Sequence, residues 1–284
     1  MRILVTGCNG QLGNEIKVLS NQYKSFNFIF SDINELDITN RKSLYTFIEN
    51  NSIDFIINCA AYTNVNKAEN EVEFAYLINE TAVGYLAQIS SEKNIRLIQV
   101  STDYVFDGNH YLPYKEDDIT NPLSIYGKTK LAGEKKILSS TNKAIIIRTS
   151  WLYSSFGNNF VKTIIRLGNE NNLVKMVYDQ IGTPTYAADL ADTILKIISS
   201  GKDFNETEIF HYSNEGVISW YDFAQAIIED KNISCKILPI ETWEYPTPAK
   251  RPCYSVFNKA KIKKEFDIEI PYWRESLRKM LKRL

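Results

Sequence analysis

Short apolar runs alternate with longer amphipathic stretches through residues 1–150. Most of these runs are continuously apolar, as in Ala144-Ile145-Ile146-Ile147, rather than alternating with polar residues. Such runs are typical of parallel strands that are buried on both faces. The expected strands are Arg2–Thr6, Asn27–Ser31, Phe55–Cys59, Arg96–Ser101 and Ala144–Arg148. The expected helices between them lie near Leu12–Asn21, Arg41–Asn50, Glu73–Glu92 and Ser124–Leu138.

This order of strands and helices predicts an α/β fold with a Rossmann-type, doubly wound parallel sheet. Ligands of such sheets gather at the carboxyl ends of the strands. After residue 150 the pattern loosens into helical stretches and shorter apolar runs, near Asn159–Asn171, Val174–Val177, Ala187–Ser200, Ile209–Tyr212, Trp220–Glu229 and Trp273–Leu284. We expect residues 1–155 to form the Rossmann domain, to which a segment at about 186–215 returns. Residues 156–284 are expected to form a smaller C-terminal substrate-binding lobe.

Composition narrows the class of protein. The 284 residues are 44% hydrophobic and 24% charged, with a formal net charge of −1, which is typical of a soluble globular protein. No strong positive field favours nucleic acid or an acidic membrane as a partner. Neither a signal peptide nor a long apolar run is evident, and the four cysteines form no C-x-x-C pair. The two histidines, His110 and His211, are far apart, so we expect a cytoplasmic protein without a zinc site.

Glycines follow the first expected strand at a regular spacing. Gly7, Gly10 and Gly13 form a G-x-x-G-x-x-G run that opens the first expected helix. A tight strand-to-helix turn favours glycine, and a pyrophosphate can approach bare backbone at the N-terminus of the helix. The run alone is weak evidence, since glycines also occur in ordinary loops. Its place between a strand and a helix favours a dinucleotide site.

An acidic residue ends the second expected strand. Asp32 lies 19 residues beyond Gly13, where a carboxylate can accept hydrogen bonds from the adenosine ribose of a dinucleotide. The same charge would repel a 2′-phosphate. The cofactor is therefore expected to be NADH or NADPH, with NADH favoured; the alternative for Asp32 is a solvated loop residue.

Candidate catalytic residues follow the fourth expected strand. Thr102 stands where that strand ends, and Tyr126 and Lys130 lie one turn apart on the next expected helix. A lysine ammonium near a phenol favours phenolate, so the pair is expected to lower the pKa of Tyr126. A phenol of that kind can exchange a proton with a substrate oxygen while a hydride moves to the adjacent carbon.

The Y-x-x-x-K spacing is not specific by itself. With 17 tyrosines, the chain also contains the pair Tyr111 and Lys115, but Pro113 between them argues against one helix. The structural alternative for Tyr126 is a half-buried aromatic residue at the start of a helix. The glycine run, Asp32 and Thr102 make the catalytic interpretation the stronger one.

Several segments together resemble the extended short-chain dehydrogenase/reductase superfamily and, within it, the dTDP-4-dehydrorhamnose reductase family. They span nearly the whole chain in order. They are Gly10–Gly13, Asn58–Glu69, Ser101–Gly108, Tyr126–Glu134, Arg148–Trp151, Gly157–Phe160, Asp179–Thr185 and Tyr245–Pro252.

The resemblance implies a role for each matching residue. Tyr126 would donate a proton to the C4 oxygen of a sugar nucleotide, Lys130 would hold the nicotinamide ribose, and Thr102 would tune the tyrosine. The implied cofactor-binding residues are Gly7, Gly10, Gln11, Leu12, Gly13, Asp32, Asp37, Ile38, Ala61, Tyr62, Thr63, Tyr126 and Lys130. The implied substrate-binding residues are Thr102, Asp103 and Trp151. Arg251 is added by its charge, because a guanidinium suits diphosphate oxygens; the alternative is a surface arginine.

Two features depart from the family pattern. Position 62 is Tyr where His is common. Some members form a dimer that holds Mg²⁺ through glutamates; Glu15 fits one such position, but Ala188 stands where another glutamate is expected. We therefore expect no metal at the site, and a monomer or a homodimer.

The implied reaction is NAD(P)H-dependent reduction of the C4 keto group of dTDP-4-dehydro-β-L-rhamnose to dTDP-β-L-rhamnose. One alternative is a reductase of another 4-keto-6-deoxy sugar nucleotide, with specificity set by Trp151 and the loop Pro246–Pro252. Another is a non-catalytic NADP-binding regulatory subunit, against which the intact Thr102, Tyr126 and Lys130 argue.

Overall fold

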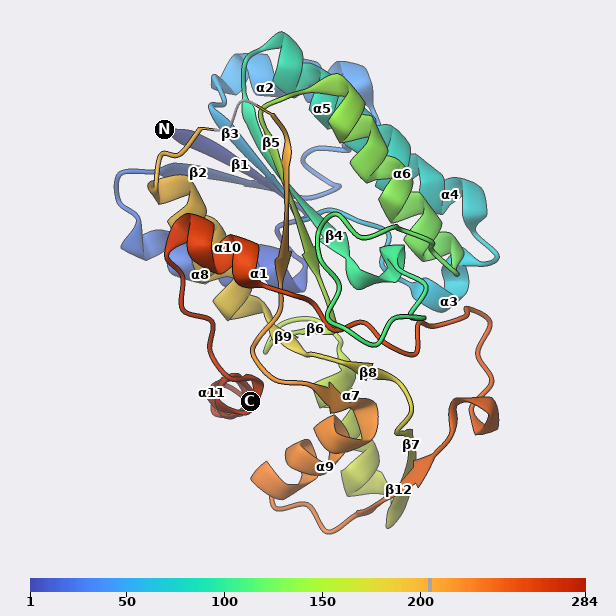
Figure 1. Ribbon diagram of the computed structural model, residues 1–284. Helices are drawn as coiled ribbons and strands as arrows, with labels where there is room; N and C mark the ends of the chain where they lie inside the picture. The colour runs from blue at the N-terminus through green and yellow to red at the C-terminus, as the bar shows by residue number, and fades with distance from the viewer. Residues whose placement is uncertain (204–205) are drawn as a thin grey trace.

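A parallel sheet lies at the centre of the molecule (Figure 1). The structure, a computed structural model, describes residues 1–203 and 206–284. Among these residues the central sheet has six strands in the order β10-β5-β4-β3-β1-β2, and every neighbouring pair is parallel. The strands are β1 Arg2–Thr6, β2 Asn27–Ser31, β3 Phe55–Asn58, β4 Arg96–Thr102, β5 Ala144–Thr149 and β10 Glu208–Tyr212. Because the chain reverses its direction of winding between β1 and β3, a crevice is expected at the carboxyl ends of these strands.

Helices cover both faces of the sheet (Figure 1). One face carries α2 Arg41–Asn51, α5 Val83–Glu92 and α6 Ile125–Ser140; the other carries α1 Gln11–Leu19, α8 Ala187–Ser199 and α10 Ala260–Phe266. Side chains alternate between the two faces along each strand. In β1, Leu4 packs with the α2 and α5 side, whereas Ile3 and Val5 pack with α1 and α8. Burial on both sides explains why the strands are continuously apolar.

The predicted Rossmann-type sheet is confirmed. All the strands expected in residues 1–150 begin at the predicted residue. The run Ile209–Tyr212 belongs to β10, which pairs with β5 at the edge of the sheet, and α8 packs on α1. Within the predicted returning segment, Phe204 and Asn205 lie outside the described residues.

The stretch Glu73–Glu92, predicted as one helix, is interrupted. It begins as α4 Val72–Tyr76, continues as a π-helical turn over Leu77–Ala82 and resumes as α5. The short helix α3 Val65–Ala68 precedes it, and the 3₁₀ turn η3 Asp103–Val105 follows β4. A π-helical turn inside a helix often marks a functional site.

The second lobe has its own core around Phe223, Ile227 and Trp273. Its helices are α7 Phe160–Glu170, α9 Trp220–Asp230 and α11 Trp273–Leu281, and β7 Leu173–Val177 pairs with β12 Lys236–Ile240. Two further short strand pairs are β6 Leu152–Tyr153 with β9 Thr185–Tyr186 and β8 Ile181–Gly182 with β11 Ile218–Ser219. Within the described part of the chain, no helix has the length and apolar character needed to span a membrane.

Candidate active site

A cavity of about 770 Å³ opens at the carboxyl ends of the central strands. On the side of the sheet, the cavity is lined by the loop after β1, the residues after β2 and β3, and the end of β4. The segment before α7 supplies the opposite wall, which includes Trp151, Leu152, Gly157, Asn158 and Asn159. A crevice in this position is where a doubly wound sheet binds its ligand.

The glycine run forms one end of the cavity. Gly7 has a φ of +62°, and a Cβ atom there would lie 2.6 Å from the backbone nitrogen of Ala60. A Cβ on Gly13 would lie 2.5 Å from the carbonyl oxygen of Gly7. Gly10 caps α1 without a side-chain hydrogen bond, so the first N–H groups of the helix have no side-chain acceptor at this cap. Bare backbone and an open helix N-terminus fit the pyrophosphate of a dinucleotide.

Asp32 lies directly after β2 and lines the same cavity, with Asp37 and Ile38 beside it. One oxygen of the Asp32 carboxylate accepts a hydrogen bond from the backbone of Asn9 at 2.9 Å. The other accepts one from the backbone of Ile33 at 2.9 Å. The residues predicted for the adenosine half therefore share one end of the cavity.

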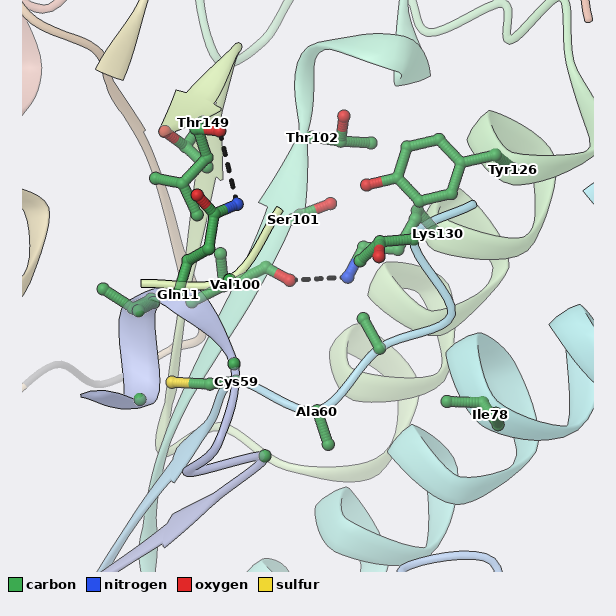
Figure 2. Close-up of a pocket in the computed structure, with 18 of the residues that line it drawn as sticks. Gln11, Cys59, Ala60, Ile78, Val100, Ser101, Thr102, Tyr126, Lys130 and Thr149 are labelled. Atoms are coloured by element: carbon green, nitrogen blue, oxygen red, sulfur yellow. Dashed lines mark hydrogen bonds between the residues drawn. The ribbon is translucent and has the colours of Figure 1, made fainter. Parts of the chain in front are cut away.

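Tyr126, Lys130 and Thr102 meet at the other end (Figure 2). Ser124 caps α6 by accepting a hydrogen bond from the backbone of Gly127, which fixes where the helix begins. The side chain of Thr102 is hydrogen-bonded to Tyr126, and Lys130 Nζ donates to the carbonyl oxygen of Val100 at 2.7 Å. The helix and the end of β4 thus bring the three predicted catalytic residues into one space.

The predicted lowering of the Tyr126 pKa is wrong for this arrangement. Burial raises the pKa of Tyr126 above its usual range, the hydrogen bond to Thr102 opposes the rise, and Asp103 and Tyr104 add to it. Lys130 instead donates a hydrogen bond to the Val100 carbonyl. Its own pKa is lowered to about 8 by burial. Burial also raises the pKa of Asp103 to about 6, although hydrogen bonds with Ser255 and Thr102 act to lower it. A protonated Tyr126 is the form that can act as a general acid.

Trp151 has an unusual backbone. Its φ of +47° lies in the left-handed region, which a bulky residue rarely adopts. Its ring stacks on Trp220 at 3.6 Å between centroids, and a Cβ atom on Gly182 would come within 2.7 Å of it. The surroundings therefore hold the ring in place at the wall of the cavity, despite backbone strain of a kind that is common at functional sites.

Two predicted site residues do not line the cavity. The Tyr62 phenol donates to Glu71 at 2.6 Å, although the neighbours of Tyr62, Ala61 and Thr63, do line the cavity. Arg251 Nη1 donates to the Tyr104 hydroxyl at 3.3 Å, and Tyr104 is itself part of the wall. Arg251 therefore lies one side chain away from the cavity.

Sequence reasoning missed several lining residues. Tyr104 packs edge-to-face on Tyr126 at 5.5 Å between ring centroids. It belongs to the same segment, Ser101–Gly108, as the predicted residue Thr102, and this position was the signal that could have identified it. Asn159 donates to the side chain of Gln11 at 3.0 Å and so links the second lobe to the glycine loop. Asn159 lies in Gly157–Phe160, one of the segments that resemble the reductase family, and this position could have identified it as a site residue. Phe74 and Ile78 belong to the interrupted helix and carried no signal.

The competing Y-x-x-x-K pair is outside the site. Tyr111 is 84% exposed, and no helix joins it to Lys115. Neither residue lines the cavity. Spacing alone therefore did not separate the two pairs, whereas the proline between Tyr111 and Lys115 did.

Comparisons with known proteins cover the whole chain. The family model described as the RmlD substrate binding domain matches residues 1–284. A dTDP-4-dehydrorhamnose reductase of Aggregatibacter actinomycetemcomitans is 42% identical over 98% of this chain and 97% of its own length. The chain belongs to the dTDP-4-dehydrorhamnose reductase family.

Solved structures agree with this family assignment. A dTDP-4-dehydrorhamnose reductase from Clostridium acetobutylicum superposes with a TM-score of 0.94 and is 42% identical, over 99% of each chain. The enzyme from Bacillus anthracis, solved in complex with NADP, has a TM-score of 0.95 and 38% identity, over 100% of this chain and 99% of its own. As a member of this reductase family, the chain is an oxidoreductase with a Rossmann-type nicotinamide cofactor site.

Proposed function

We propose that this chain reduces the C4 keto group of dTDP-4-dehydro-β-L-rhamnose to dTDP-β-L-rhamnose, using NADH or NADPH. The observation that carries the proposal is the meeting of Tyr126, Lys130 and Thr102 in a cavity that also contains the glycine run. Membership of the reductase family over residues 1–284 supports the substrate.

In this proposal the bound nicotinamide supplies the hydride that reduces C4. Tyr126 donates its proton to the C4 oxygen as negative charge develops there, which its protonated state allows. Thr102 orients the phenol through their hydrogen bond, and the Lys130 ammonium holds the nicotinamide ribose. Trp151 and Asp103 contact the sugar. Arg251, which lies behind Tyr104, binds the diphosphate.

The remaining site residues are proposed to bind the cofactor as the sequence predicts. Gly7, Gly10, Gln11, Leu12 and Gly13 hold the pyrophosphate, and Asp32 favours NADH because its carboxylate faces the place of a 2′-phosphate. In the same proposal residues 1–155 form the cofactor-binding Rossmann domain, to which a segment at about 186–215 returns, and residues 156–284 form the lobe that binds the substrate. We also propose that the protein works in the cytoplasm as a monomer or a homodimer.

The first experiment replaces Tyr126 by Phe and follows nicotinamide absorbance with dTDP-4-dehydro-L-rhamnose. Loss of the general acid should lower kcat at least about a hundredfold. Tyr111→Phe is the matched control: it changes the tyrosine of the other Y-x-x-x-K pair, which is exposed, and should keep the wild-type rate.

The same assay with other 4-keto-6-deoxy sugar nucleotides tests the substrate. A higher kcat/KM for one of these would replace the proposed substrate. An unchanged rate in Tyr126→Phe would contradict the proposed mechanism.

A further inference from the structure

The helix α6 presents a stripe of polar side chains to the end of β4. Tyr126, Lys130 and Glu134 lie one turn apart on the same face of the helix. Tyr126 is hydrogen-bonded to Thr102, and Lys130 Nζ donates to the carbonyl oxygen of Val100 at 2.7 Å. The Glu134 carboxylate accepts a hydrogen bond from the hydroxyl of Ser101. Consecutive residues of β4 thus bind successive turns of α6, two of which carry predicted catalytic residues.

Glu134 is also paired with a cation from the neighbouring strand. Its carboxylate accepts hydrogen bonds from Arg148 on β5, with Nη2 at 2.8 Å and Nε at 3.1 Å. The side chains of Arg148 and Glu134 are only 3% and 1% exposed. Glu134 does not line the cavity, so it reaches neither substrate nor cofactor directly. Its carboxylate is held in place by two strands.

The charge of Lys130 depends on its surroundings. The residue is 5% exposed, and the hydrogen bond that its Nζ makes goes to a neutral carbonyl oxygen. Burial lowers the pKa of Lys130 to about 8, and Glu134 is the first group that opposes the shift, followed by Cys59. An opposite charge nearby favours the charged form of an amine.

The other groups around Lys130 do not titrate near pH 8. Burial raises the pKa of Cys59 to about 12 and that of Tyr126 above its usual range, so both stay protonated. The pKa of Asp103 is raised to about 6 by burial, so it is already ionised. Burial keeps the pKa of His211, which lies against Arg148, well below its usual range.

We propose that Glu134, fixed by Arg148 and Ser101, is a positioning residue that keeps Lys130 charged and holds α6 in register with the end of β4. This inference rests on the proposed role of Lys130 in holding the nicotinamide ribose. An ammonium donates stronger hydrogen bonds to the ribose hydroxyls than a neutral amine does. Glu134 therefore sets the pH above which the cofactor is held less tightly.

The test measures NADH binding without substrate, from the fluorescence of the reduced nicotinamide. NADH has no 2′-phosphate, so the ligand itself does not titrate between about pH 7 and pH 10. Wild-type affinity should fall as pH rises through the pKa of Lys130, because the ammonium is lost. In Glu134→Gln the midpoint of that fall should move to lower pH by about one unit. The conservative variant Glu134→Asp should restore most of the wild-type midpoint.

Glu15→Gln is the matched control, since Glu15 is also 1% exposed and paired with an arginine, Arg283, but is not among the groups that shift Lys130. Its midpoint should equal that of the wild type. If Glu134→Gln does not fold, the double variant Glu134→Gln/Arg148→Met removes both buried charges. Its midpoint should still move down, because Glu134 and not Arg148 is among the groups that act on Lys130, but by less than in Glu134→Gln, since a cation is lost as well.

A midpoint that stays at the wild-type value in the folded Glu134 variant overturns the proposal, even when the affinity is uniformly weaker. An equal shift in Glu15→Gln overturns it as well. Because no sugar nucleotide is present, these outcomes are distinct from a failure of the proposed substrate.

Discussion

Asp32 illustrates how one side chain serves two purposes. Its carboxylate accepts hydrogen bonds from the backbone of Asn9 and Ile33, each at 2.9 Å, and so ties the glycine loop to the end of β2. It also lines the cavity at the end assigned to adenosine. In the proposed function its negative charge bears on cofactor choice, because a 2′-phosphate brought beside it would be repelled.

Replacing Asp32 by Asn tests this effect on the cofactor. The amide can keep one hydrogen bond to the loop but removes the charge, so the ratio of kcat/KM for NADPH to that for NADH should rise by roughly tenfold. The measurement is steady-state kinetics with both cofactors at one ionic strength. Glu35→Gln is the control: its carboxylate accepts from the Asp32 backbone at 3.0 Å but does not line the cavity. An equal change in both variants would contradict a direct role of Asp32.

At the scale of single residues, local chemistry determined much of the candidate site. Three features of the site can be recognised in the sequence: the glycines that admit no Cβ atom, the acid after β2 and the tyrosine–lysine pair on one helix face. Each of them depends on residues that are close along the chain. Arg251 and Tyr104 show the limit. Their contact at 3.3 Å joins segments 147 positions apart, and no local pattern encodes such a distance.

At the scale of elements, α6 depends on glycines for its close approach to its neighbours. A Cβ atom on Gly127 would lie 2.2 Å from the carbonyl oxygen of Tyr104, and one on Gly133 would lie 2.1 Å from that of Asn79. Asn79 lies in the π-helical turn, and its side-chain amide accepts a hydrogen bond from the Tyr62 N–H at 2.9 Å and donates one to the Tyr62 carbonyl oxygen at 3.0 Å. The helix that carries the proposed catalytic pair is therefore packed directly on backbone.

Gly127→Ala should move α6 away from η3 and separate Tyr126 from Thr102. We expect kcat to fall at least about tenfold and the free energy of unfolding to drop by about 1–3 kcal/mol, because the clash is with backbone. Urea unfolding and the nicotinamide assay measure the two effects.

Gly84→Ala provides the control for Gly127→Ala. A Cβ atom on Gly84, in α5, would meet only the side chain of Lys136 at 3.6 Å, an ordinary contact. Alanine is a better helix former, so this variant should be neutral or more stable by up to about 1 kcal/mol. A loss of stability in Gly84→Ala as large as that in Gly127→Ala would show that the close approach of α6 is not the cause.

The elements that the sequence did not predict have weak local patterns. Helix α10 contains three lysines in seven residues, and its packing on β10 depends mainly on Ile262 and Phe266. Strand β12 contains Pro239 and pairs with β7, another short strand. The π-helical turn at Leu77–Ala82 keeps the apolar spacing of a helix. In each case contacts with distant segments determine the conformation.

At the scale of the whole molecule, the C-terminal end of the chain is attached to the cofactor side of the fold. Arg283 follows α11 and donates to Glu15 on α1 at 2.8 Å, and to the hydroxyl of Tyr186. Glu15 also accepts from Ser154 at 2.6 Å. These contacts join the second lobe to the helix that follows the glycine run.

Arg283→Ala should weaken this attachment. It leaves the buried carboxylate of Glu15 without its cation, so the free energy of unfolding should fall by about 1–3 kcal/mol, measured by urea unfolding. Lys282→Ala, at the neighbouring exposed position, should change it by less than about 0.5 kcal/mol. Adding Glu15→Gln to Arg283→Ala should recover part of the loss; no recovery would mean that the charge on Glu15 is not the cause.

The sequence by itself determined the parallel sheet and the glycine cradle, and it singled out Thr102, Tyr126 and Lys130 as the proposed catalytic residues, because strand burial, tight turns and helix faces are local properties. Only the tertiary structure decided the protonated state of Tyr126, which burial controls. It also decided the setting of Lys130 between the Val100 carbonyl and Glu134. Burial and charge depend on every segment packed around a group, and the fold brings those segments together from distant parts of the chain.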